Sequence, residues 1–226
     1  PAKILLDSLK NIADQPLTFD IDKNFAVEIT SSNGKYKVQG ENPDNFPKEP
    51  PADDENSFTI SSSALVTAIN KTIFAVSTDD LRPAMTGVYF ELDKSSIAFV
   101  ATDAHRLVKY VRKDVKCPKK DAFIVPKKPL SLLKAALPDN EDELNVSYNK
   151  NHLFIKHGGT ELVCRLIDAR FPDYKVVIPA DNPYSLMVNR NDFQGALRRV
   201  QVFSNKSTNQ VALTISGSEL QLAAQD

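Results

Sequence analysis

The 226-residue sequence is poor in the residues that build many cofactor and metal sites. Its seven glycines form no glycine-rich phosphate loop, so we expect no nucleotide cofactor. Cys117 and Cys164 lack metal-ligand spacing, and His152 and His157 have no carboxylate or cysteine set around them. The sequence therefore predicts no metal site, and it predicts reduced, structural cysteines in a cytoplasmic protein.

Long apolar runs are also missing. No stretch approaches the roughly twenty apolar residues of a membrane span, and no secretory signal is visible at the start of the sequence. The hydrophobic content of 42% and the charged content of 25% are ordinary for a globular protein. We therefore expect a folded chain with no membrane partner.

The net charge of −1 conceals an uneven distribution of charge. Segments 2–12, 61–77, 126–137 and 189–204, which contain the predicted helices, carry +1, +1, +3 and +2, and this leaves −8 on the remaining residues. Such separation can create a local field even when the total charge is near zero. The alternative is that lysines simply suit solvated helix faces.

An amphipathic helix followed by short alternating strands recurs at a spacing of about sixty residues. The predicted helices are Ala2–Ile12, Ser61–Ser77, Lys127–Leu137 and Arg190–Ser204. The predicted strands are Leu17–Ile21, Ala26–Thr30, Lys35–Gln39, Ser57–Ile60, Gly87–Leu92, Ser96–Thr102, Leu107–Arg112, Ala122–Val125, Leu144–Tyr148, His152–Lys156, Thr160–Ile167, Ser185–Val188, Gln210–Ser216 and Glu219–Ala224. We expect Asn33-Gly34 to form a hairpin turn. Neighbouring copies of such a unit usually share a core that none could build alone.

The connections between units repeat as well, because Phe46-Pro47 recurs as Phe171-Pro172, 125 residues later. Two units therefore form one domain. Residues 1–51 lack a strand before their helix and match the second half of a domain, residues 52–179 match a complete domain, and residues 180–226 match a first half. We therefore expect a fragment that is cut inside two flanking domains.

Four stretches of the sequence closely resemble the bacterial sliding clamp, the beta subunit of the replicative DNA polymerase III holoenzyme. They are LRPAMTGVYFE at 81–91, VATDAHRL at 100–107, ARFPDY at 169–174 and LRRVQVFSN at 197–205. The resemblance implies an α+β DNA clamp fold of repeated helix-plus-antiparallel-strand units, with helices on the inner face of a ring and sheets outside. It also implies a three-domain subunit that dimerises head to tail around duplex DNA.

The resemblance implies a processivity factor without catalytic activity, located in the bacterial cytoplasm. Its partners would be double-stranded DNA of any sequence, a second copy of the chain, the replicative DNA polymerase, the clamp loader and repair proteins. The proteins would bind through short linear motifs. A ring of this kind holds a polymerase on DNA by topology, so each contact with the DNA can be weak.

Three groups of site residues follow from the resemblance. The peptide-binding pocket, between the middle and third domains, would be lined by Met85, Thr102, Ala104, His105, Arg106, Leu107, Pro172, Val176 and Val177. DNA phosphates would be contacted by Arg82, Lys127 and Lys128, and the helix start at Lys127 adds a partial positive charge. The dimer interface would include Ile12, Tyr36, Val38, Val202 and Phe203.

The sequence departs from the family's pattern at three of the expected wall positions. Ala104 stands where glycine is common, Val176 where some members have a basic residue, and Thr208 where some have an aromatic one. Two other functions remain open. Asp103 and His105 could serve a hydrolase, or the chain could be a scaffold that binds peptides but not DNA.

Overall fold

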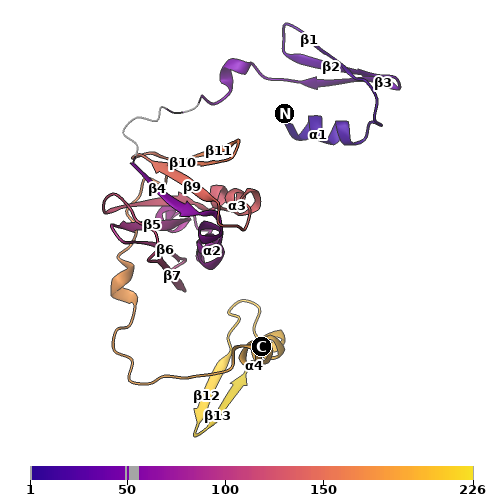
Figure 1. Cartoon of the computed structure of the whole chain (residues 1–226). Coiled ribbons are helices and arrows are strands. Elements are labelled where there is room, and N and C mark those ends of the chain that lie inside the picture. The colour runs from indigo at the N-terminus through magenta and orange to yellow at the C-terminus, as the bar shows by residue number, and fades with distance from the viewer. Residues whose placement is uncertain (1, 49, 51–55, 226) are drawn as a thin grey trace. The chain divides into compact units, whose positions relative to one another are not determined.

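A computed structural model describes residues 2–48, 50 and 56–225 of the chain (Figure 1). The chain divides into two compact units, Pro1–Pro172 and Asp173–Asp226. We refer to residues 2–48 as the N-terminal repeat, to 56–172 as the central repeats and to 189–225 as the C-terminal repeat. The predicted domain boundary between residues 51 and 52 lies outside the described residues. No helix within the described ranges is long and apolar enough to cross a membrane.

The N-terminal repeat has the predicted helix and strands. Helix α1 (Ala2–Lys10) precedes an antiparallel sheet of β1 (Thr18–Ile21), β2 (Ala26–Ser31) and β3 (Gly34–Gln39), in the order β1-β2-β3. The predicted Asn33-Gly34 turn is wrong by one residue, because Ser31 pairs with Gly34 and the turn consists of Ser32 and Asn33. The side chains of Ser31 and Gln15 accept hydrogen bonds from the backbone N–H groups of Asn33 and Ser32 and so hold this turn.

The central repeats form two four-stranded sheets. The first repeat contains β4 (Asn56–Ser61), α2 (Ser62–Thr72), the 3-10 turns η2 (Ile73–Ala75) and η3 (Pro83–Met85), β5 (Gly87–Asp93), β6 (Ser96–Thr102) and β7 (Leu107–Arg112). The second contains β8 (Asp121–Pro126), α3 (Lys127–Ala136), β9 (Glu143–Tyr148), β10 (His152–His157) and β11 (Thr160–Arg165). The sheet orders are β7-β6-β5-β8 and β11-β10-β9-β4.

Each central repeat places its leading strand in the sheet of the other. Strand β4 pairs antiparallel with β9, and β8 pairs antiparallel with β5. One hydrophobic core therefore serves both repeats and contains Phe58 and Phe90 from the first and Leu130 and Leu153 from the second. The expectation of a shared core is confirmed, because neither repeat could complete its sheet without the other.

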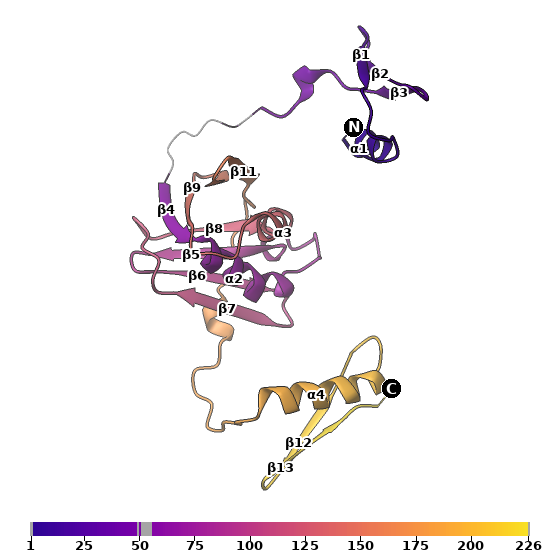
Figure 2. The same ribbon diagram turned by 45° about the vertical axis from the view of Figure 1, so that its right-hand side comes forward.

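Helices α2 and α3 pack against each other (Figures 1 and 2). Ser61 caps α2, and its hydroxyl accepts a hydrogen bond from the backbone N–H of Ala64 at 3.3 Å. Each helix buries one apolar face. Leu65 and Ile69 on successive turns of α2, and Leu130 and Leu133 on successive turns of α3, are almost fully buried. The polar faces of both helices are left exposed, which places their lysines in solvent.

The predicted strand Thr160–Ile167 ends early, at Arg165. The backbone N–H of Ile167 instead donates to the carbonyl of Ile124 in β8, at 3.0 Å. The chain after β11 thus leaves one sheet and contacts the other. A single hydrogen bond of this kind cannot be foreseen from local alternation.

The second unit contains the 3-10 turn η4 (Tyr174–Val177) and the C-terminal repeat. That repeat consists of α4 (Arg190–Val200), the 3-10 turn η5 (Gln201–Phe203) and the hairpin of β12 (Ala212–Ser216) and β13 (Glu219–Ala223). The predicted strand Ser185–Val188 is wrong, because this segment has no strand structure and Met187 is 99% exposed. A leading strand forms only when it pairs with the other repeat of its domain, and the described residues provide no such partner for it.

Candidate nucleic-acid and peptide interfaces

The predicted DNA-contacting residues come from two elements that the structure joins. Arg82 precedes η3, and Lys127 is the first residue of α3. The backbone N–H of Lys127 donates to the carbonyl of Thr86 at 3.3 Å, and that of Met85 donates to the carbonyl of Arg82 at 2.9 Å. The first bond therefore connects the start of α3 to the turn that carries Arg82, and the second closes that turn.

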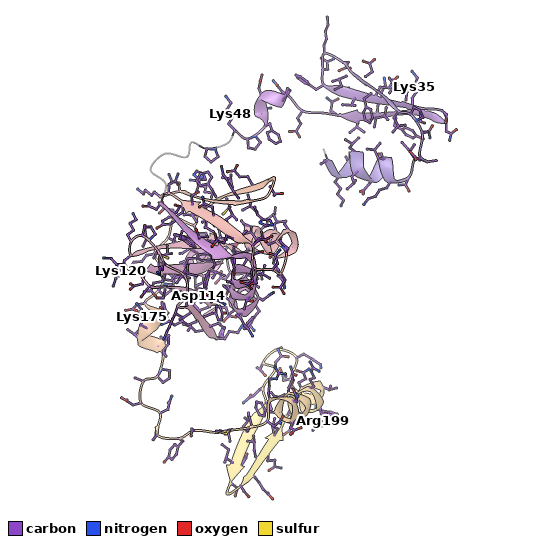
Figure 3. All side chains as sticks on the ribbon, viewed as in Figure 1. Lys35, Lys48, Asp114, Lys120, Lys175 and Arg199 are labelled. Carbon is purple, nitrogen blue, oxygen red and sulfur yellow. The ribbon has the colours of Figure 1, made fainter. Side chains whose placement is uncertain are left out.

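The two lysines of this region differ from other cations of the central repeats because they form no ion pair with any described residue. Lys120 pairs with Asp93 at 3.1 Å, and Arg112 pairs with Asp114. Figure 3 labels Lys120 and Asp114 on the central repeats. Lys127 and Lys128, by contrast, are exposed and form no salt bridge within the described ranges. The first turn of α3 has no side-chain cap, so its partial positive charge adds to theirs. This site can attract an anion without first breaking an ion pair at either lysine.

Arg82 forms an exposed ion pair that the sequence analysis missed. Its Nε donates to Oδ2 of Asp79 at 2.8 Å. Hydrogen bonds from the Arg82 side chain and from the backbone N–H of Leu81 hold the pKa of the Asp79 carboxyl below its usual value. The signal that could have found the pair is the spacing of three residues between an aspartate and an arginine in a turn.

Five of the predicted peptide-binding residues lie at the turn between β6 and β7. Thr102 ends β6 and Leu107 begins β7. The buried Thr102 hydroxyl donates to the carbonyl of Arg106 at 2.8 Å and accepts from the backbone N–H of Ala104 at 3.1 Å. Thr102 therefore shapes the turn, which leaves Ala104, His105 and Arg106 exposed.

Met85 and Arg106 each contact the segment that follows α2. The backbone N–H of Ser77 donates to the carbonyl of Met85 at 2.9 Å. The Arg106 guanidinium carbon lies 5.7 Å from the centre of the Phe74 ring, in cation–π geometry. Phe74 was not predicted as a site residue, since an aromatic residue near the end of an amphipathic helix is more simply explained by packing.

The remaining predicted pocket residues belong to different units, Pro172 to the first and Val176 and Val177 to the second. Phe171, next to Pro172, stacks on Tyr89 with ring centres 4.6 Å apart. Val176 and Val177 lie in η4 of the second unit and are 77% and 64% exposed. The structure thus places five of the nine predicted residues at one turn, and the complete pocket stays a prediction.

Ala104 has a left-handed backbone conformation, with φ of +74°. In this region the Cβ of an L-residue approaches the following carbonyl oxygen, whereas glycine is unstrained. Alanine at this position therefore introduces backbone strain at the centre of the turn.

Ala104→Gly should raise the free energy of unfolding by about 0.5–1 kcal/mol, because relief of strain outweighs the extra freedom of glycine in the unfolded chain. Urea denaturation measures the change. Ala135→Gly, at an exposed position of α3, is the matched control and should lower stability by about 1 kcal/mol. Equal losses in both variants would contradict the assignment of strain.

The Asp103–His105 hydrolase hypothesis finds no support in the geometry. Oδ1 of Asp103 accepts hydrogen bonds from the backbone N–H groups of His105 and Arg106, and Oδ2 accepts from Nε of Arg106 at 3.0 Å. Burial raises the pKa of this carboxyl, but these hydrogen bonds outweigh it and keep the pKa below its usual value. Among the described residues, no hydrogen bond joins Asp103 to the His105 imidazole.

The predicted dimer residues differ in exposure. Tyr36 and Val38 lie on β3, where Tyr36 is exposed and Val38 is half-buried, and Ile12 is half-buried after α1. Val202 and Phe203 lie in η5, and Phe203 is 68% exposed. Exposed apolar side chains are thus present on both the N-terminal and the C-terminal repeat.

The raised pKa values of the two cysteines are explained by burial. Cys117 and Cys164 are buried free thiols, and burial raises the pKa of each to about 11. A thiol with such a pKa stays protonated at neutral pH and is a poor nucleophile.

Comparison with known structures first defines the class. The fold matches the crystal structure of the DNA polymerase sliding clamp from Bacillus subtilis, with a TM-score of 0.85 and 25% identity over 98% of this chain and 59% of that one. It also matches the fold of the DNA polymerase III subunit beta from Pseudomonas aeruginosa, with a TM-score of 0.86 and 24% identity over 100% of this chain and 62% of that one. The helix-and-sheet repeats therefore form a sliding-clamp fold.

The sequence then defines the family. Residues 59–173, which are 115 of the 226 residues, match the model of the DNA polymerase III beta subunit, central domain, and the chain belongs to this family. The "Beta sliding clamp" proteins of Staphylococcus epidermidis strain ATCC 35984 and Staphylococcus aureus strain Mu50 are each 27% identical over 97% of this chain. The chain spans 58% of the length of these relatives.

Proposed function

We propose that this chain is part of a DNA polymerase processivity factor, a ring-forming sliding clamp that encircles duplex DNA. The observation that carries the proposal is the start of α3 in a clamp-family fold. Lys127 and Lys128 are exposed there and form no salt bridge with any described residue, and a backbone hydrogen bond joins Lys127 to the turn that follows Arg82. The proposed role is mechanical, without catalysis, in the cytoplasm of a bacterium.

The chemistry of the proposed contact suits movement along DNA. Lysine is a flexible point charge that binds phosphate without reading bases. Binding of this kind releases counterions, so it depends on salt rather than on sequence. A few such contacts bind DNA only weakly. A closed ring would keep the protein on the DNA although each contact is weak.

The proposed domain organisation follows the repeats. Residues 1–51 would be the second half of the first clamp domain, 52–179 the middle domain and 180–226 the first half of the third. The exchange of β4 and β8 between the central repeats supports the view that two repeats make one domain. The polymerase, the clamp loader and repair proteins would bind at the turn between β6 and β7.

Duplex binding at low salt tests the proposed function. Fluorescence anisotropy with two short duplexes of unrelated sequence should give equal dissociation constants. With about three phosphate contacts, the logarithm of the association constant should fall with the logarithm of salt concentration with a slope of about −2 to −3. A tenfold preference for one sequence, or binding that salt does not affect, would exclude the proposed contact. Peptide binding without DNA binding would favour the scaffold.

The chain should associate with itself at tens of micromolar, because Tyr36 leaves apolar surface exposed on the N-terminal repeat and Val202 and Phe203 do so on the C-terminal repeat. Light scattering measures the mass of the species. Phe203→Asp should shift the distribution toward monomer, whereas a charge at exposed Leu132 of α3 should not. A wild-type monomer at these concentrations would show that the exposed side chains do not form an interface.

A further inference from the structure

Two arginines of the predicted sites are each held by an aspartate three residues earlier. Asp79 accepts from Nε of Arg82 at 2.8 Å through one carboxylate oxygen and from the backbone N–H of Leu81 at 3.0 Å through the other. Asp103 accepts from Nε of Arg106 at 3.0 Å in the same way, while its second oxygen accepts backbone N–H groups of the turn. The same arrangement therefore occurs at the predicted DNA site and at the predicted peptide site.

The arrangement leaves the outer end of the Arg82 guanidinium available. Within the described ranges, its hydrogen bonds involve Nε alone, so the two terminal amino groups have no protein partner. A guanidinium carries five N–H donors in a rigid plane and binds phosphate best through two of them at once. Arg82 can therefore bind a phosphate while it keeps its bond to Asp79.

Asp79 is itself fixed at several points. Its backbone N–H donates to the Ser77 hydroxyl at 3.0 Å, and its carbonyl accepts from the backbone N–H of Arg82 at 3.1 Å. The same turn continues to Thr86, which accepts the hydrogen bond from the first residue of α3. Backbone hydrogen bonds thus fix Asp79 in the turn that also contacts the start of α3.

We propose that Asp79 is a positioning residue for DNA binding, which holds the Arg82 guanidinium so that its terminal amino groups face a phosphate beside Lys127 and Lys128. The proposal rests on the proposed function. Exposed ion pairs contribute little to the free energy of folding. The pair between Asp79 and Arg82 is therefore better explained by the orientation that it gives to the guanidinium than by stability. Fixing a long side chain before binding removes part of the entropy cost of ordering it in the complex.

The direction in which Asp79→Asn changes DNA affinity distinguishes a positioning role from a simple effect of charge. Asp79→Asn removes a negative charge near the DNA, so charge alone predicts tighter binding. Positioning predicts the opposite, because the neutral amide holds the guanidinium less well. We expect the dissociation constant for duplex DNA at low salt to rise about two- to tenfold.

Asp80→Asn provides the matched control. It makes the same change in charge at the next residue, which is exposed and forms no ion pair within the described ranges. Asp80→Asn should leave binding unchanged or tighten it. In an Arg82→Ala background, Asp79→Asn should no longer weaken binding, because the residue through which it acts is gone.

Anisotropy of one labelled duplex with all variants decides the proposal, and thermal melting confirms that each is folded. Tighter binding by Asp79→Asn, or equal weakening with and without Arg82, would overturn the positioning role. Arg82→Ala must itself weaken binding, and unchanged binding by that variant would also overturn it. The proposed function fails separately, if reversing the charges of Lys127 and Lys128 leaves duplex binding unaltered.

Discussion

Replacing Gly87 by alanine should lower the free energy of unfolding by about 2–3 kcal/mol, the largest single-residue effect that we expect. A Cβ at this position would lie 2.5 Å from the carbonyl oxygen of Val125 and 2.8 Å from Cγ2 of Ile124. Gly87 pairs with Pro126 where β5 meets β8. The obstructing oxygen belongs to the backbone of an exchanged strand, so it cannot move without disturbing both repeats.

Guanidinium denaturation of the wild type and of Gly87→Ala measures this loss. Gly159→Ala is the matched control, because a Cβ there meets no atom within 4 Å and the backbone is not left-handed. Its effect should stay within about 0.5 kcal/mol. Similar stability for the two variants would mean that the contact between β5 and β8 is looser than the structure indicates.

Reversing the charges of Lys127 and Lys128 to glutamate should weaken duplex binding at low salt at least tenfold, on the order expected for two lost phosphate contacts plus repulsion. The slope of the salt dependence should become shallower by about 2, since each lysine that contacts a phosphate contributes nearly one released counterion. Anisotropy measured over a series of salt concentrations gives both quantities.

The control for this variant is the pair Lys113→Glu and Lys116→Glu. These exposed lysines follow β7, and the double substitution makes the same change in net charge. It should weaken binding only slightly and leave the salt slope unchanged. Equal effects of the two double variants would show that DNA responds to the total charge and not to the start of α3.

The sequence predicted the helices and most of the strands because their signals are local. An amphipathic stripe and a capping serine place α2, and Pro126 marks the passage into α3. The partner of each leading strand was not predicted. Strand β4 pairs with β9, more than eighty residues away, and alternation of side chains does not specify which edge a strand joins.

The errors at Ser185–Val188, at the Asn33-Gly34 turn and at the end of the predicted strand Thr160–Ile167 have the same cause, which is that tertiary contacts decide local structure. Ser185–Val188 has the apolar pattern of a leading strand, but a strand also needs an edge to pair with. At the Asn33-Gly34 turn, the side chains of Gln15 and Ser31 select a turn one residue earlier than glycine alone would favour. Neither contact can be read from the four or five residues involved.

The candidate sites were predictable to different degrees. The lysines at the start of α3 follow from sequence position, since a helix start exposes its first turn. The ion pair between Asp79 and Arg82 depends on the fold of an irregular turn, and the contact of Arg106 with Phe74 joins the turn between β6 and β7 to η2. The strain at Ala104 likewise becomes visible only from its backbone angle.

Lysine footprinting tests the central claim, that the start of α3 faces DNA, most directly. The wild-type chain would be acetylated with and without duplex DNA at low salt, and each lysine quantified by mass spectrometry. Lys127 and Lys128 should be protected by DNA, while Lys113 and Lys116 keep their reactivity. Unchanged reactivity of Lys127 and Lys128 while the duplex is bound would contradict the account.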